Sequence, residues 1–129
     1  MRNKIYICKH CGNVVTKIED SKVNISCCGE NMKELIPNTV DAAQEKHIPV
    51  VTIDKETLHV VVGEVKHPML EEHYIVWIMV ETDNGIQIKY LNPNDNPEIK
   101  FPILNDKIRA VYAYCNTHGL WIKNFTKNK

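Results

Sequence analysis

The chain has 129 residues, and its 16 basic and 16 acidic side chains give a formal net charge of zero. This length allows one ordinary domain, or one small domain joined to a module too short to build its own core. The even charge balance argues against nucleic acid as the main partner. The longest apolar run, Tyr74 to Val80, is far shorter than the ~20 residues that span a bilayer, so we expect no membrane partner. The charged N-terminus does not resemble a signal peptide, which favours a cytoplasmic protein.

Residues 1–36 are predicted to form a separate small module. Its apolar stretches, at residues 5–7, 14–15 and 23–25, are short and interrupted by glycines. A segment of this size buries too little apolar surface to offset its chain entropy. The module therefore needs an additional stabilising cross-link, such as a bound metal ion.

Residues 37–39 are predicted to be a linker, and residues 41–46 predict one or two helical turns capped by Asn38 or Thr39. After His47 the pattern is that of an antiparallel β-sandwich, because short apolar stretches with strand character alternate with turn residues. The predicted strands cover residues 58–62, 73–80, 86–90, 98–103, 108–114 and 120–125. We therefore expect a mainly β protein.

Two of these strands carry a positional signal. Residues 73–80 are apolar on both faces, as in a central strand. Pro102 cannot donate a ladder hydrogen bond, so the strand at 98–103 is predicted to lie at a sheet edge.

The first group of candidate metal ligands is the set of four cysteines in the small module. The spacing is C-x2-C, then fifteen residues, then C-C, which gives Cys8, Cys11, Cys27 and Cys28. A C-x2-C turn presents two thiolates to one tetrahedral ion, and the second pair completes the shell. Adjacent cysteines predict a distorted tetrahedron. The alternative is a C-x-x-C redox dithiol with two unrelated cysteines.

The choice of metal stays open at this point. Four thiolates suit zinc or a single iron ion. Disulfides are not expected, because the count of five cysteines is odd and the predicted compartment is reducing. His10, inside the C-x2-C turn, is interpreted as a solvated side chain.

A second group of candidates lies at the ends of predicted elements. Loops at one end of a sandwich can converge on a point, and a C-x2-H turn can place a thiolate and an imidazole on one ion. Each histidine taken alone is better explained as a surface or core residue, and His59, in mid-strand, is left outside the group. The members are His47, His67, His73, Cys115 and His118.

These stretches together resemble desulfoferrodoxin, the two-iron class of superoxide reductase. The resemblance covers nearly the whole chain, in order. It rests on the C-x2-C-x15-C-C spacing and on Glu45-Lys46-His47, His67-Pro68-Met69, His73-Tyr74-Ile75 and Cys115-Asn116-Thr117-His118-Gly119.

The resemblance implies a desulforedoxin-like module at residues 1–36 and an immunoglobulin-like superoxide reductase domain at residues 37–129. The module would hold iron with Cys8, Cys11, Cys27 and Cys28. In the second domain, the imidazoles of His47, His67, His73 and His118 would lie in a plane around a second iron. The thiolate of Cys115 would occupy the axis, with the backbone N–H groups of Thr117 and His118 bonded to its sulfur.

The implied reaction is O2•− + e− + 2H+ → H2O2, without release of O2. By resemblance, Lys46 supplies positive charge and helps protonation, and Glu45 binds the ferric iron after turnover. A rubredoxin-like protein would be the electron donor, and the chain would form a homodimer. The alternatives are a superoxide dismutase, a zinc-ribbon binding module on an immunoglobulin-like domain, and an electron carrier that uses the four-thiolate centre alone.

Overall fold

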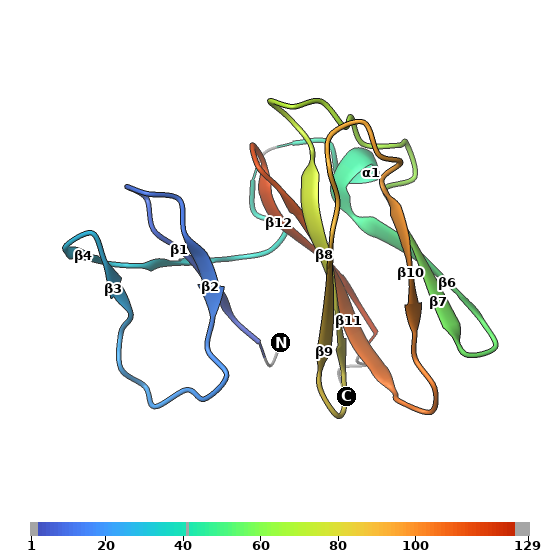
Figure 1. Ribbon diagram of the computed structural model, residues 1–129, viewed down its shortest axis with the longest axis horizontal. Helices are drawn as coiled ribbons and strands as arrows, with labels where there is room; N and C mark the ends of the chain where they lie inside the picture. The colour runs from blue at the N-terminus through green and yellow to red at the C-terminus, as the bar shows by residue number, and fades with distance from the viewer. Residues whose placement is uncertain (1–2, 41, 126–129) are drawn as a thin grey trace. The chain divides into compact units, whose positions relative to one another are not determined.

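The computed structural model describes residues 3–40 and 42–125. The chain divides into two compact units, Met1–Ile36 and Pro37–Lys129 (Figure 1). Both units are built from antiparallel strands, which confirms the prediction of a mainly β protein. In the described part of the chain, no helix is long and apolar enough to cross a membrane.

The smaller unit contains two small sheets. Within its described residues, a three-stranded sheet has the order β2-β1-β5, and a two-stranded hairpin pairs β3 with β4. Residues 23–25, which include the apolar Val23 and Ile25, do not form a strand, and Val23 is exposed. The strands are β1 (Ile5–Ile7), β2 (Val14–Thr16), β3 (Ser26–Cys27), β4 (Glu30–Asn31) and β5 (Lys33–Leu35).

The larger unit is a sandwich of two antiparallel sheets. Within residues 42–125, one sheet has the order β10-β7-β6 and the other has the order β12-β11-β8-β9. Strand β8 lies inside its sheet, as its apolar faces predicted, and β10, which contains Pro102, lies at an edge. The strands are β6 (Pro49–Asp54), β7 (Thr57–Val62), β8 (Ile75–Thr82), β9 (Ile86–Tyr90), β10 (Glu98–Pro102), β11 (Ile108–Cys115) and β12 (Gly119–Asn124).

The core of the sandwich follows from alternation along its strands. In β7, Leu58, Val60 and Val62 are fully buried while the intervening residues are partly exposed. Burying each of these side chains stabilises the fold by about 1.5–3 kcal/mol. They pack in one apolar cluster with Phe101 of β10 and Val111 of β11.

Side chains of β9, at the edge of the four-stranded sheet, donate hydrogen bonds to β10, at the edge of the three-stranded sheet. The amide of Gln87 donates to the carbonyl of Pro102 at 2.6 Å, and the ammonium of Lys89 donates to the carbonyl of Lys100 at 2.7 Å. The apolar members of β9 point the other way: Ile88 is 41% exposed and Tyr90 is 75% exposed. Alternation therefore identified this strand but did not reveal that its apolar face is uncovered.

The helical segment differs from its prediction. Helix α1 (Gln44–His47) has a single turn, and Ala43 precedes it without a side-chain cap. Asn38, a predicted cap, instead exchanges two hydrogen bonds with the backbone of Ile122 in β12. Asp41, in the predicted helix, lies outside the described residues. The linker side chain thus binds to the sandwich rather than to the helix.

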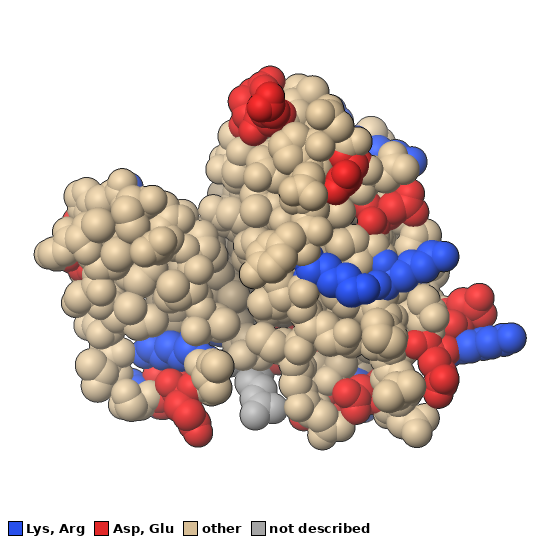
Figure 2. Space-filling model, viewed as in Figure 1, with Lys and Arg blue, Asp and Glu red and all other residues tan. Residues whose placement is uncertain are grey.

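Charged side chains are dispersed over the face shown in Figure 2. Basic and acidic groups are both present on it, and most of the face is uncharged. This distribution agrees with the zero net charge of the sequence.

Candidate metal centres

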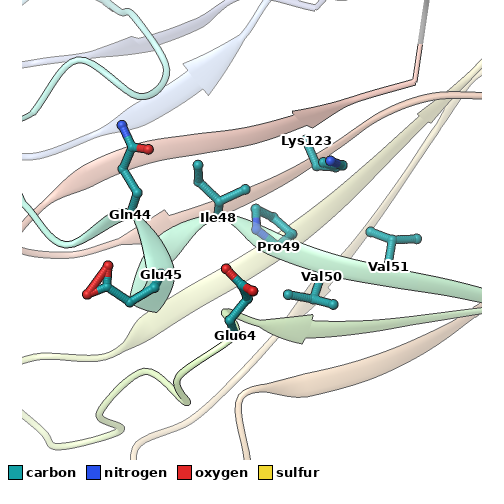
Figure 3. A pocket seen from close by; sticks show the side chains of 8 residues that line it. All are labelled: Gln44, Glu45, Ile48, Pro49, Val50, Val51, Glu64 and Lys123. Atoms are coloured by element: carbon teal, nitrogen blue, oxygen red, sulfur yellow. The ribbon is translucent and has the colours of Figure 1, made fainter.

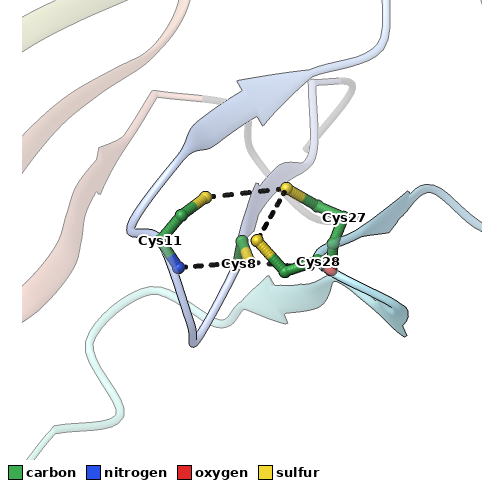
Figure 4. A group of neighbouring side chains, drawn as sticks. All are labelled: Cys8, Cys11, Cys27 and Cys28. Atoms are coloured by element: carbon green, nitrogen blue, oxygen red, sulfur yellow. Dashed lines mark hydrogen bonds between the residues drawn. The ribbon is translucent and has the colours of Figure 1, made fainter.

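The four cysteines of the smaller unit converge. Their sulfur atoms all lie within 4.8 Å of one another (Figure 4). The Sγ atoms of Cys11 and Cys27 are 3.6 Å apart, and those of Cys27 and Cys28 are 3.9 Å apart. Sulfur atoms at this spacing can share one ion.

Left-handed backbone conformations allow the adjacent cysteines to face the same point. Cys28 has a φ of 53° and Gly29 a φ of 76°, so the chain reverses at once after Cys27. Strands β3 and β4 form a hairpin around this turn, with Cys27 opposite Glu30. Left-handed backbone is unusual for a cysteine, and here it aims two neighbouring side chains into one site.

The electrostatics of this four-cysteine cluster favour a bound cation. The backbone N–H of Cys11 donates to the sulfur of Cys8 and lowers the pKa of Cys8 to about 6. The pKa of Cys28 is raised to about 12, first by hydrogen bonding with Cys11 and Cys8 and then by further neighbouring sulfurs and burial. One thiolate is thus stable, whereas four together require a positive ion.

His10 is exposed, as predicted, but it has a partner. Its Nε2 atom lies 2.5 Å from a carboxylate oxygen of Glu30. Glu30 follows the Cys27–Cys28 turn, so this pair connects the two cysteine-bearing turns from outside the cluster. The sequence did not suggest this partner, because the two residues lie twenty positions apart.

The second cluster gathers residues from α1, from the connection between β7 and β8, and from the turn between β11 and β12 in the larger unit. His47 ends α1, His67 follows β7, His73 precedes β8, Cys115 ends β11 and His118 precedes β12. One ligand atom from each of the first four residues lies within 4.8 Å of the others. His118 is outside that group of four, but its Nδ1 atom is 3.2 Å from Nε2 of His47. We call these five residues the His/Cys cluster.

The four imidazoles are arranged as a square. Neighbouring ring centroids are separated by 4.6 Å (His47–His67), 4.7 Å (His67–His73), 4.9 Å (His73–His118) and 5.0 Å (His118–His47). The centroids of His47 and His73, on a diagonal, are 6.5 Å apart. This diagonal distance is longer than each of the four side distances, as expected for rings at the corners of a square.

Hydrogen bonds fix which ring nitrogens face inward. Nδ1 of His47 donates to the carbonyl of Ala43, and Nδ1 of His67 donates to the carbonyl of Pro68, both at 2.6 Å. In neutral rings the Nε2 atoms then carry lone pairs, yet they lie 3.1 Å apart. Nε2 of His73 is buried without a hydrogen-bond partner in the described part of the chain. Lone pairs aimed at a shared point, with one buried atom unsatisfied, fit a metal ion.

Three of the rings, those of His47, His67 and His73, are held in their neutral form. Burial lowers the pKa of His67 to about 4, and burial is also the main reason that the pKa values of His47 and His73 are lowered. The positive charges of neighbouring groups, Lys46 among them, lower the last two further. Neutral imidazole is the form that binds metals.

Two further contacts support the cluster: sequence reasoning did not select Trp121, and it named Thr117 only for its backbone N–H. The indole of Trp121 is fully buried, stacks on the ring of His47 at 4.7 Å and donates to the carbonyl of His118. The hydroxyl of Thr117 lies 3.4 Å from the buried sulfur of Cys115. A tryptophan two residues after the C-x2-H-G turn is the signal that could have indicated the first contact.

Glu45 and Lys46 are both exposed beside the cluster on α1. Glu45 lines a pocket of about 460 Å³ together with Glu64, Lys123 and neighbouring residues of α1 and β6 (Figure 3). None of the nine candidate ligands lines that pocket. The carboxylate of Glu45 is therefore not among the groups that the structure already brings together.

His59 is separate from both clusters. Its Nε2 atom lies 2.8 Å from a carboxylate oxygen of Glu98 on the neighbouring strand β10. It is a surface pair across the sheet, in agreement with its exclusion from the candidate ligands.

The fold and the two clusters define a class of protein: a small four-thiolate module followed by a β-sandwich with an imidazole and thiolate metal site. Residues 39–124 match the desulfoferrodoxin family profile, and residues 1–35 match the profile of the desulfoferrodoxin N-terminal domain. The chain belongs to the desulfoferrodoxin family. Its two clusters match the two iron centres of that family, which settles the open choice between iron and zinc.

Known relatives agree with this assignment. A desulfoferrodoxin of Nitratidesulfovibrio vulgaris is 44% identical over 92% of this chain and 93% of its own length. A superoxide reductase of Thermococcus kodakarensis is 34% identical over 64% of this chain and 87% of its own. The crystal structure of the superoxide reductase from Treponema pallidum superimposes with a TM-score of 0.79 and 34% identity, covering 96% of this chain and all of that one.

Proposed function

We infer that this chain is a superoxide reductase, an oxidoreductase that adds one electron and two protons to superoxide and releases hydrogen peroxide without O2. The observation that carries this function is the His/Cys cluster: four imidazoles in a square with one buried thiol beside them, in a chain of the desulfoferrodoxin family. The alternative function, a zinc-ribbon binding module, does not explain this cluster.

The chain carries two iron ions. We propose that residues 1–36 are the desulforedoxin-like module and hold one of them with Cys8, Cys11, Cys27 and Cys28. Residues 37–129 are then the immunoglobulin-like catalytic domain and hold the other with His47, His67, His73, Cys115 and His118. When bound in the His/Cys cluster, iron supplies the single electron that superoxide takes up.

The buried thiol of Cys115 gives this cluster its reducing character. A thiolate donates more electron density to a metal than an imidazole does, which favours passing an electron to an oxygen species. Cys115 is fully buried at the end of β11, so water does not compete for its sulfur. Thr117 and the neighbouring backbone N–H groups tune the charge on that sulfur by hydrogen bonding.

Lys46 attracts the substrate. Superoxide is an anion, and the ammonium of Lys46 is exposed while its charge is felt at the rings of His47 and His73. A positive charge at the entrance raises the local concentration of an anion, and salt screens this effect. The same ammonium supports the delivery of the protons that the product needs.

Glu45 closes the oxidised site. A carboxylate is a hard oxygen ligand, which suits ferric iron better than ferrous iron. Because its side chain lines the pocket beside α1, Glu45 would have to turn its carboxylate toward the His/Cys cluster to serve as such a ligand.

The biological setting follows from the same family assignment. We propose that a rubredoxin-like protein donates electrons, that the chain acts as a homodimer, and that it detoxifies superoxide in the cytoplasm. The apolar, uncovered face of β9 is compatible with self-association.

The stoichiometry of the products tests the reaction. With superoxide and an excess of reductant, the holoprotein should form one peroxide for each superoxide consumed, with no O2. A dismutase returns half of its substrate as O2, and a zinc-ribbon module consumes none. Release of O2 in proportion to the superoxide consumed would show that the protein is a dismutase and not a reductase.

A further inference from the structure

We propose that Asn116 is a positioning residue of the His/Cys cluster, which holds the segment that carries His73 against the turn that carries Cys115 and His118. This inference rests on the ligand set proposed above. It assigns a task to a side chain that binds neither metal nor substrate.

Asn116 makes three hydrogen bonds that bracket His73. Its Oδ1 atom accepts from the backbone N–H of Tyr74 at 2.9 Å, and its Nδ2 atom donates to the carbonyl of Glu72 at 3.2 Å. Its own backbone N–H donates to the carbonyl of Tyr74 at 3.2 Å. One residue therefore binds the chain immediately before and immediately after a proposed ligand.

The backbone of His73 itself is held by Leu70. The N–H of His73 donates to the carbonyl of Leu70 at 3.1 Å, and the N–H of Leu70 donates to the carbonyl of His73 at 2.9 Å. Together, Leu70 and Asn116 occupy each backbone polar group from the carbonyl of Glu72 to the carbonyl of Tyr74. Removing the Asn116 side chain releases two of these groups to water.

The position of the His73 ring depends on that backbone more than the positions of the His47 and His67 rings depend on theirs. Carbonyl oxygens orient His47 and His67 through Nδ1. Within the described residues, the ring of His73 makes no hydrogen bond, and its Nε2 atom is buried and unsatisfied. The direction of its lone pair is therefore set by how firmly residues 72–74 are held.

The backbone hydrogen bonds between β8 and β11 do not hold residues 72–74 in place by themselves. The pairing of β8 with β11 shifts register between Tyr114 and Cys115, just where the ligands begin. Asn116 follows that irregularity and continues the connection with side-chain atoms. The task needs an acceptor atom and a separate donor atom on one short side chain, and asparagine offers both. An ionised aspartate only accepts, and serine has a single oxygen for both bonds.

A metal competition experiment on the holoprotein tests the proposal. Asn116→Ala removes both side-chain bonds, and Asn116→Asp keeps an acceptor but removes the donor. Asn84→Ala is the matched control: this exposed asparagine, beyond the other end of β8, donates to a carboxylate of Asp106 at 2.7 Å. The readouts are the iron affinity of each centre against a chelator and the hydrogen exchange of the Tyr74 amide.

Supporting residues around a metal ligand typically contribute a factor of ten or more to metal affinity. We therefore expect Asn116→Ala to weaken iron binding at the His/Cys cluster about tenfold and to speed exchange of the Tyr74 amide. Asn116→Asp should lie between this variant and the parent. The four-cysteine centre serves as the internal reference and should keep its affinity, and Asn84→Ala should change neither readout.

Faster exchange at Tyr74 with unchanged iron affinity at the His/Cys cluster would overturn the proposal, since Asn116 would then hold backbone without positioning a ligand. If Asn116→Ala does not fold, the same comparison with Asn116→Asp decides. A parent protein that binds no iron at the His/Cys cluster would instead refute the proposed function, so the two failures are distinguishable.

Discussion

Gly63→Ala tests whether the close packing behind α1 positions Lys46 and His47. Gly63 follows β7 and is buried against the backbone of Glu45 and Lys46. A Cβ atom added there would lie 2.5 Å from the carbonyl oxygen of Glu45 and 2.9 Å from the carbonyl carbon of Lys46. Both are backbone atoms, which cannot rotate away as a side chain can.

The size of the effect follows from these distances. Ordinary contact begins near 3.4 Å, so the backbone of Glu45 must retreat by about 1 Å. Such overpacking in a buried site costs about 1–3 kcal/mol of unfolding free energy. The same shift strains the 2.9 Å bond from Val65 N–H to the Glu45 carbonyl. Displacing reactive groups by about 1 Å lowers rates by up to about a hundredfold.

The assay compares urea unfolding and the rate of superoxide consumption in Gly63→Ala and in Gly85→Ala. Gly85 lies in the turn between β8 and β9, where an added Cβ meets nothing within 4 Å. We expect Gly85→Ala to match the parent and Gly63→Ala to lose both stability and rate. A Gly63→Ala protein as stable and as fast as Gly85→Ala would refute the reasoning that α1 is positioned by this contact.

Three further variants test separate parts of the account. Cys115→Ser should abolish superoxide reduction while the circular dichroism spectrum is retained, because a hydroxyl donates far less electron density than a thiolate; full activity would exclude the role of the sulfur. Lys46→Ala should slow superoxide consumption and flatten its dependence on salt, and an unchanged rate and slope would make Lys46 an ordinary surface lysine. Burial, and then the bond to Glu81, raise the pKa of Tyr112 above its ordinary value. The neutral phenol is therefore the folded form, and its stabilisation is complete below the ordinary pKa of about 10 and is lost at higher pH. In Tyr112→Phe, unfolding free energy should fall less steeply above about pH 10 than in the parent, and equal slopes would contradict this cause.

The four-cysteine cluster was predictable from the sequence because its ligands lie close in the chain and the module is too short to fold without a staple. The strands of the sandwich were also predictable where apolar and polar residues alternate, as in β7. Strand β6 was missed although Val50, Val51, Thr52 and Ile53 are β-branched residues that favour strands. Its position depends on pairing with β7, which is a tertiary effect.

The His/Cys cluster required more than spacing. His47 and His118 lie 71 positions apart, and they meet only because two loops and a helix converge on one place. Their places at the ends of predicted elements made these residues candidates, and the family resemblance assigned them to one metal site, whereas periodicity did not select them. The supporting contacts of Asn116 were not predictable, because its partners are backbone carbonyl and N–H groups, which carry no sequence signal of their own.

A metal count tests whether both clusters hold iron in one chain. The protein should be purified without oxygen, and iron and zinc should be measured per chain. We expect two irons and little zinc. One zinc and no iron would contradict this expectation, because redox chemistry would be removed and a metal-stapled binding module would remain.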